Sequence, residues 1–189
     1  VGLIATLLAA MTGDNSAYRV AQVQPMKLAA MEALYNGGKG ESLTAIAAVH
    51  PFKQPDYESE QEPAMRIAIP NMLSFLATRT ADGYVPGVND ILKGYTKEDG
   101  TREPSVQEKI ARGKKAIVAL KTYRETKAQD QLPILKENMK YFGYGYIKDA
   151  KELVPSIPIC FYTFRLMVGV GCLLILFFAL SLFLVYKKE

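Results

Sequence analysis

Hydrophobic residues are concentrated at the two ends of this chain, and the longer run is at the C-terminal end. From Leu166 to Tyr186 the sequence reads LMVGVGCLLILFFALSLFLVY and contains no charged residue. As a helix rising about 1.5 Å per residue, the run is roughly 32 Å long, enough to cross the hydrocarbon core of a bilayer. Arg165 precedes it, and Lys187 and Lys188 follow it. We therefore predict a transmembrane helix over residues 158–187.

The opening run, VGLIATLLAAM, is apolar but too short to span a membrane alone. It lacks the basic start and the small-residue cleavage site of a signal peptide. We predict that residues 1–12 are the C-terminal end of a truncated transmembrane helix, closed by a turn at Gly13–Ser16, and that the sequence is a fragment. A buried helix of a soluble domain is the alternative.

Between these runs, residues 13–157 have the mixed pattern of a long external loop. Pro25 suits the first turn of a short helix that reaches about Tyr35. Glycines and prolines predict a loop over 37–63, with a helical turn near 43–49, and Pro70 splits the apolar stretch that follows. The fold class is thus an all-α membrane protein fragment: the end of one transmembrane helix, a long and mostly helical external loop, and one complete transmembrane helix.

The second half of the loop predicts a helical hairpin. Ser105 and Glu108 have the spacing of a capping box at a helix start. Apolar positions then recur at helical spacing, with Lys and Arg residues on the opposite face; they are Val106, Ile110, Gly113, Ile117 and Leu120. A second helix is expected from about Leu132 to Phe142. Both helices have the pattern of packing elements.

Charge and residue counts exclude several classes of function. The net charge is +4, and 20 basic against 18 acidic residues remain once Arg165, Lys187, Lys188 and Glu189 are set aside. Such a near-neutral region does not predict nucleic-acid binding. The one histidine, His50, is expected at the surface, so a haem or zinc site built only on histidines of this chain is excluded. Lys187 and Lys188 favour a cytoplasmic C-terminus, which puts residues 13–157 on the outer side of the membrane.

The short helix after Pro25 has a pattern that suits a quinol, which is a flat apolar ring with hydroxyls at opposite ends. With Lys27 at 0°, Met31 lies near about 40°, Tyr35 near about 80° and Glu32 near about 140°. A carboxylate can take a proton from such a hydroxyl, and an ammonium can stabilise negative charge on the other oxygen. An ordinary amphipathic helix has the same pattern, and the pattern alone does not separate the two.

The start of the C-terminal run, YTFRLMVGVGC, holds a second candidate group. Arg165 near the end of a transmembrane helix calls for an acidic partner such as a carboxylate or a haem propionate. Met167 lies on a different face, with Gly171 one turn later, and a thioether beside a glycine leaves room for a flat macrocycle. The simpler interpretation is that Met167 faces lipid, Gly171 eases helix packing and Arg165 reaches the membrane surface.

Four stretches, in this order and spacing, resemble subunit I of the cytochrome bd-type quinol oxidases. They are GDNSAYRVAQVQPMKLAAMEALY, ATRTADGYVPGV, FGYGY and FRLMVGVG. The resemblance covers nearly the whole chain and is most specific at Gly13–Glu32 and Phe164–Gly171. It implies an external quinol-binding loop at 13–157, with Lys27 and Glu32 in quinol binding and oxidation and Tyr18 nearby. It also implies that Met167 is an axial ligand of the low-spin haem b iron and that Arg165 supports that haem.

The resemblance further implies a multi-pass subunit of a bacterial inner-membrane enzyme that reduces oxygen and generates a proton motive force. Its substrate is a quinol, its neighbours are membrane lipid and a second membrane subunit, and the full-length protein also holds high-spin haem b and haem d. The other haem ligands of the family lie outside this sequence, so the fragment alone is expected to be inactive. The alternative hypothesis is a single-span anchored protein whose outer domain binds a partner and has no redox role.

Overall fold

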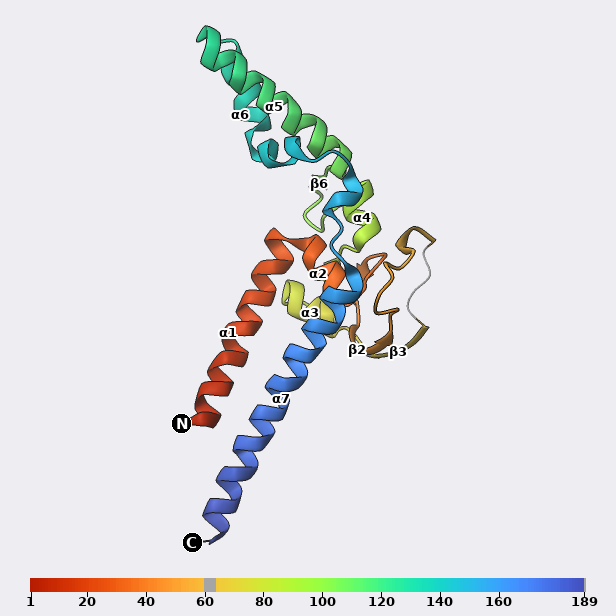
Figure 1. Ribbon diagram of the computed structural model, residues 1–189, viewed down its shortest axis with the longest axis vertical. Helices are drawn as coiled ribbons and strands as arrows, with labels where there is room; N and C mark the ends of the chain where they lie inside the picture. The colour runs from red at the N-terminus through yellow and green to blue at the C-terminus, as the bar shows by residue number, and fades with distance from the viewer. Residues whose placement is uncertain (60–63, 189) are drawn as a thin grey trace.

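The computed structural model describes residues 1–59 and 64–188, and its longest elements are two helices that run side by side (Figure 1). Helix α1 spans Gly2–Val23 and α7 spans Ile157–Lys188. A Cβ built on Gly2 would lie 2.5 Å from Cε1 of Phe178, so the glycine permits the two helices to approach closely where α1 begins. A helix thus covers the whole range 158–187 in which we predicted one, and its passage through a membrane stays a prediction. Among the described residues, α7 is the helix long and apolar enough to cross a membrane.

The turn predicted at Gly13–Ser16 is wrong, because α1 continues through these residues to Val23. A single Gly or Asn costs only about 1 kcal/mol in a helix, and tertiary contacts can outweigh that cost. Here the carboxylate of Asp14 accepts two hydrogen bonds from Arg79, at 3.0 and 2.6 Å. Further along, the Gln22 amide donates to the carbonyl of Ala77 at 3.0 Å. Both partners belong to or adjoin α3, so α1 is held against that helix.

Helix α2, Pro25–Glu32, follows α1 after one residue and begins at Pro25 as predicted. It ends at Glu32, about a turn before the predicted end, because Ala33 adopts a left-handed conformation with φ of 49°. Its small residues Ala29 and Ala30 are fully buried in a core shared with α4, α5 and α7, whereas Leu28 packs in a second cluster with Leu73 of α3. Helix α2 is thus packed on both sides.

The region after α2 differs most from the predicted all-α fold, because three two-stranded antiparallel sheets form there. Strand β2 occupies the stretch where we predicted a helical turn, and its Ile46 pairs with Ile67 of β3. Residues 60–63 of the predicted loop lie outside the described residues. The shorter pairs are β1 with β4 and β5 with β6. The bounds are β1 Gly38–Lys39, β2 Leu43–Ala48, β3 Ala64–Ile69, β4 Tyr84–Val85, β5 Tyr95–Thr96 and β6 Arg102–Glu103.

The remaining helices include the predicted hairpin, and the fold as a whole is mainly helical as expected. The bounds are η1 Tyr57–Ser59, α3 Met72–Thr78, α4 Val88–Lys93, α5 Val106–Thr126, α6 Gln131–Asn138, η2 Met139–Tyr146 and η3 Ala150–Leu153. Ser105 caps α5 by accepting a hydrogen bond from the Glu108 amide at 3.2 Å. Helices α5 and α6 with η2 form an arm that projects away from the end where the two termini lie (Figure 1).

Candidate functional site

The junction of α2 with α7 contains a buried ion pair between Glu32 and Arg165. Nη2 of Arg165 lies 2.7 Å from Oε2 of Glu32, and Nη1 lies 3.2 Å from Oε1, so the contact is bidentate. The side chain of Glu32 is 2% exposed and that of Arg165 is 16% exposed. The same guanidinium also donates to the carbonyl oxygens of Met31 and Thr44. One arginine of α7 therefore ties together α2 and β2.

Strand β2 completes the surroundings of the Glu32 carboxyl group. The amide of Thr44 donates to Oε2 of Glu32 at 3.4 Å. The hydroxyl of Thr44 accepts a hydrogen bond of 2.8 Å from Nε of Arg66, a residue of β3. Arg66 also donates to the carbonyl and the hydroxyl of Ser42, at 3.1 and 2.9 Å. Arg165 thus donates directly to the Glu32 carboxyl group, and Arg66 is hydrogen-bonded to Thr44 of β2, whose amide donates to that carboxyl group.

Burial raises the pKa of Glu32, and the hydrogen bond and charge of Arg165 only partly offset that rise. Loss of hydration disfavours the charged form, whereas a nearby guanidinium favours it. A carboxyl group with a raised pKa is a better proton acceptor near neutral pH than an exposed one.

The base of α7 also holds Arg165 between aromatic rings. Its guanidinium carbon lies 4.2 Å from the ring centroid of Phe161 and 5.4 Å from that of Phe164. Phe161 is buried in the main core. Among the described atoms, Nε of Arg165 is a buried polar atom that lacks a hydrogen-bond partner. Cation–π contacts of this kind help to compensate an arginine for lost water, so the two rings add to the ion-pair contacts of Arg165.

The other two predicted quinol-binding residues lie apart from this ion pair. Lys27 is exposed on α2, whereas Met31, one turn later, is half-buried. Tyr18 of α1 is half-buried, and the guanidinium carbon of Arg79 lies 4.9 Å from its ring centroid. The structure therefore buries Glu32 against Arg165, whereas Lys27 is exposed and Tyr18 packs against Arg79. His50 is exposed, as predicted.

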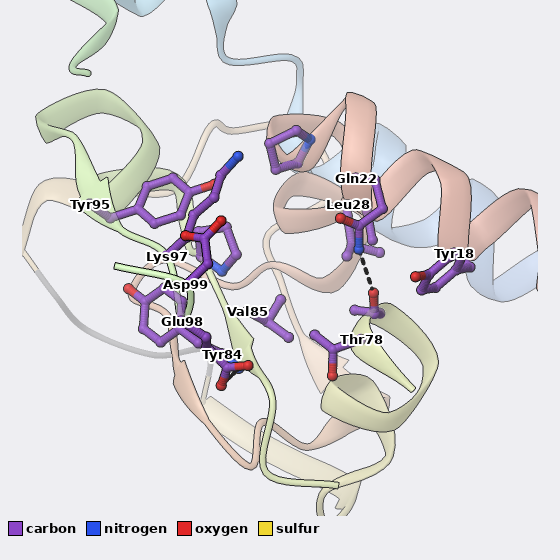
Figure 2. A pocket seen from close by; sticks show the side chains of 14 residues that line it. Tyr18, Gln22, Leu28, Thr78, Tyr84, Val85, Tyr95, Lys97, Glu98 and Asp99 are labelled. Carbon is purple, nitrogen blue, oxygen red and sulfur yellow. Dashed lines mark hydrogen bonds between the residues drawn. The ribbon is translucent and has the colours of Figure 1, made fainter. Parts of the chain in front are cut away.

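Tyr18 lines a cleft of about 330 Å³ between α1, α2, α3 and strands β4 and β5. Figure 2 shows Tyr18 and Gln22 on one side, and Tyr84, Tyr95, Lys97 and Asp99 on the other. Burial raises the pKa of Tyr95 to about 12, so its hydroxyl stays protonated. In the described part of the chain, neither Lys27 nor Glu32 lines this cleft.

Comparison with known proteins identifies the family. The model of the family described as cytochrome bd terminal oxidase subunit I matches residues 1–188. The chain belongs to this family.

The chain is similar to one curated protein and to one solved structure. The chain is 30% identical over 188 residues to cytochrome bd-II ubiquinol oxidase subunit 1 of Escherichia coli (strain K12), covering 96% of this chain and 35% of that protein. The solved structure of bd oxidase from Geobacillus thermodenitrificans matches with a TM-score of 0.39 and 18% identity, over 99% of this chain and 47% of that one. The chain thus spans about a third of the length of the curated subunit 1 that it matches.

Haem is the cofactor that membership of the subunit I family implies, and Met167 carries a thioether, a donor that can hold a haem iron. Its side chain is 62% exposed on α7. A Cβ built on Gly171, one turn later on the same face, would meet nothing described within 4 Å. Arg165 points elsewhere, since two residues correspond to about 200° around a helix.

Two residues of this subunit I site, Thr44 and Arg66, were missed by sequence reasoning. Thr44 lies on β2 and Arg66 on β3, in a region that we predicted as loop or helix. The prediction therefore did not place the two side chains on one face of a sheet. A strand alternation in AMRIAI, with Arg66 between apolar neighbours, is the signal that was available. It would have placed Arg66 on one face and Met65 and Ile67 on the other. The partner, Glu32, is distant in sequence and no local pattern indicates it.

Proposed function

We propose that this chain forms the quinol-oxidising part of subunit I of a cytochrome bd-type terminal oxidase. The observation that carries the proposal is the buried pair of Glu32 with Arg165, two residues before Met167 on the same helix. The partner of the proton acceptor and a candidate iron ligand therefore lie about half a turn apart on α7. The relative from Escherichia coli is named a ubiquinol oxidase, which agrees with a quinol as the substrate.

Glu32 is the proton acceptor in this proposal. Oxidation of a quinol to a quinone releases two electrons and two protons, so a base must be within reach of a hydroxyl. An ionised carboxylate has about four acceptor positions, and three hydrogen bonds to Glu32 are present in the described structure. One position remains for the quinol hydroxyl. Arg165 keeps the carboxylate oriented and neutralises its charge before the proton arrives.

Lys27 and Tyr18 bind the quinol in this proposal, and Met31 lies between Lys27 and Glu32 on α2. In the proposed arrangement the quinol ring lies over the half-buried Met31, with its outer oxygen at the exposed Lys27 and its inner oxygen towards Glu32. The ammonium stabilises negative charge on the outer oxygen. Tyr18 borders a cleft beside α2 (Figure 2), and its part in quinol binding rests on the family resemblance.

Met167 is the residue that would hold the iron of low-spin haem b from this chain. When bound, the haem supplies one-electron chemistry to the enzyme, and a methionine ligand raises its potential. Arg165 is assigned by the resemblance to the same haem, and its hydrogen bonds in this structure are with Glu32, Met31 and Thr44.

The complete enzyme is proposed to lie in the bacterial inner membrane as a multi-pass protein, with residues 13–157 on the periplasmic side. It pairs with a second membrane subunit and holds high-spin haem b and haem d in segments outside this chain. Oxygen is reduced there, and protons released outside generate a proton motive force. The family match favours this proposal over a single-span protein with a partner-binding domain.

The test is the Glu32→Gln variant of the full-length oxidase, compared with Glu137→Gln. Glu137 is exposed on α6, within the arm. Glu32→Gln removes the base and keeps the shape, so we expect quinol-driven oxygen uptake to fall by about 100-fold or more while the haem bands stay intact. Parental uptake in Glu32→Gln would show that Glu32 is not the proton acceptor.

The haem assignment is tested separately with Met167→Leu and the matched variant Met139→Leu, whose side chain is 48% exposed on η2. We expect Met167→Leu to shift or abolish the low-spin haem b band, and Met139→Leu to leave the spectrum unchanged. An unaltered band in Met167→Leu rules out ligation by this thioether.

A further inference from the structure

Thr44 has an unusual number of roles for one strand residue. It is 3% exposed. Its amide donates to the Glu32 carboxylate, its carbonyl accepts from Arg165, and its hydroxyl accepts from Arg66. Every polar group of Thr44 is therefore bonded to a charged side chain. Because buried polar groups need hydrogen-bond partners, breaking one of these three bonds is expected to change the geometry of the other two.

Arg66 fixes the position of Thr44. Its Nε donates to the Thr44 hydroxyl at 2.8 Å, and its Nη2 donates to the carbonyl and the hydroxyl of Ser42, two residues earlier. A guanidinium has five donors in one rigid plane, so these bonds define where β2 lies relative to β3. The β2–β3 pairing is irregular, with register shifts between Thr44 and Ile46 and between Ile46 and Ala48. Main-chain pairing alone therefore constrains this part of β2 weakly.

We propose that Arg66 and Thr44 are positioning residues for quinol oxidation, which hold the Glu32 carboxylate in the orientation that receives the quinol proton. The inference rests on the proposed role of Glu32 and adds a second layer to that site. Arg66 acts through Thr44, and Thr44 acts directly on the carboxylate through its amide. A displacement of about 1 Å at a reacting group can lower the rate by a factor of about 100. A shift of Thr44 and the Glu32 carboxylate is therefore expected to slow quinol oxidation.

The charged groups around Glu32 are few in the described structure. Arg165 from α7 and Arg66 from β3 both act electrostatically on its carboxyl group. Helices α1 and α4 also pack against α2, and their charged residues are engaged elsewhere or exposed. Asp14 pairs with Arg79, Asp90 accepts from the amides of Gly37 and Gly87, and Arg19, Lys93 and Lys27 of α2 itself are exposed.

The experiment uses the full-length oxidase with four variants: Arg66→Gln, Arg66→Lys, Thr44→Val and, as the matched control, Arg102→Gln. The control removes the same charge from a side chain that is 73% exposed on β6. For each variant, kcat and KM for quinol are measured across pH, and the haem spectrum verifies assembly. Arg66→Lys and Thr44→Val are the milder changes and decide the question if Arg66→Gln does not assemble.

We expect Arg66→Gln and Thr44→Val each to lower kcat by about 10-fold or more, with KM changed much less. Combining them should lower kcat little further, because both act through one bond. Arg66→Gln should also move the acid limb of the rate profile to higher pH, since one positive charge near the base is lost. Arg66→Lys keeps the positive charge but loses the hydrogen-bond geometry of the guanidinium. It should therefore return the acid limb of the pH–rate profile to its parental position without restoring kcat.

Two results overturn the inference. The first is that Arg66→Gln and Thr44→Val have the same kcat and the same pH–rate profile as Arg102→Gln. The second is that the double variant loses the product of the two single losses in kcat, which would show that the residues act independently. Glu32→Gln, measured in parallel, keeps the two proposals distinguishable. If Glu32→Gln is inactive while Arg66→Gln and Thr44→Val are normal, only the positioning role is wrong. If Glu32→Gln itself is active, the proposed function is wrong.

Discussion

Removing Arg165 should loosen the contact between α7, α2 and β2 by an amount that depends on pH. The variant Arg165→Gln leaves a carboxyl group with a 2% exposed side chain without its partner, and also removes the donor to the carbonyls of Met31 and Thr44. Breaking a buried pair in this way costs about 3–5 kcal/mol. At about 3 kcal/mol, local opening becomes roughly 100-fold more frequent.

The sign of the pH effect follows from Glu32. Its folded-state pKa is already raised by burial, and loss of Arg165 raises it further because a favourable charge is gone. A carboxyl group whose pKa is higher in the folded state destabilises that state as pH rises from its unfolded pKa towards its folded pKa. At low pH Glu32 is protonated and the penalty is largely relieved. We therefore expect a larger loss at pH 7.5 than at pH 5.5.

The assay is hydrogen–deuterium exchange of peptides covering α2 and β2 in the full-length oxidase, corrected for the intrinsic pH dependence of exchange. Arg124→Gln is the control, since Arg124 is exposed near the end of α5. The double variant Glu32→Gln with Arg165→Gln should recover part of the protection, because no buried charge is left unpaired. Equal exchange in Arg165→Gln and Arg124→Gln, or a penalty that is the same at both pH values, would refute the reasoning.

Two further predictions concern the arm. Gly113→Ala should destabilise the packing of α5 on η2 by about 1–3 kcal/mol, because a Cβ there would lie 2.3 Å from the amide nitrogen of Gly145; Gly143→Ala, where a Cβ meets nothing described within 4 Å, is the control. Faster exchange in η2 for Gly113→Ala alone is the expected result, and equal exchange contradicts it. Ser105→Ala removes the bond to the Glu108 amide and should cost about 1 kcal/mol at the start of α5. Unchanged exchange in the first turn of α5 would mean that the cap contributes nothing.

The sequence was sufficient to predict the elements whose local pattern and environment agree. Helix α7 follows from an uninterrupted apolar run, and α5 follows from apolar positions at helical spacing after a Ser105 cap. Pro25 predicted the start of α2 for the same reason, because its fixed φ and missing N–H suit a first helical turn. At these places no distant residue was needed to decide the structure.

Where distant residues decide, the sequence pattern misled us. Gly13 and Asn15 signal a turn, yet α1 continues, with Asp14 paired to Arg79, the residue that directly follows α3. The alanine-rich β2 is a strand because β3 pairs with it and Arg66 holds Ser42 and Thr44. Both outcomes depend on contacts between residues far apart in the chain, which a local window cannot contain.

The candidate site shows the same division. Glu32 was selected as a carboxylate on a short helix, and Arg165 was expected to meet an acidic partner. That each is the partner of the other became visible only in the fold, because 133 positions separate them. Arg66 carried a charge between apolar strand residues, and only the position of Thr44 gives that charge a role.

The arm formed by α5, α6 and η2 leaves and rejoins the rest of the chain at nearly one place. Ser105 and Gln107 line a hollow of the surface together with Asp149 and Ala150, so the two ends of the arm are neighbours. Insertions or deletions between these points can lengthen or shorten the protein while the scaffold that carries Glu32 keeps its geometry. Size variation among homologous loops is therefore expected to accumulate here, and a fluorescent or affinity label is best placed at the tip near Lys127.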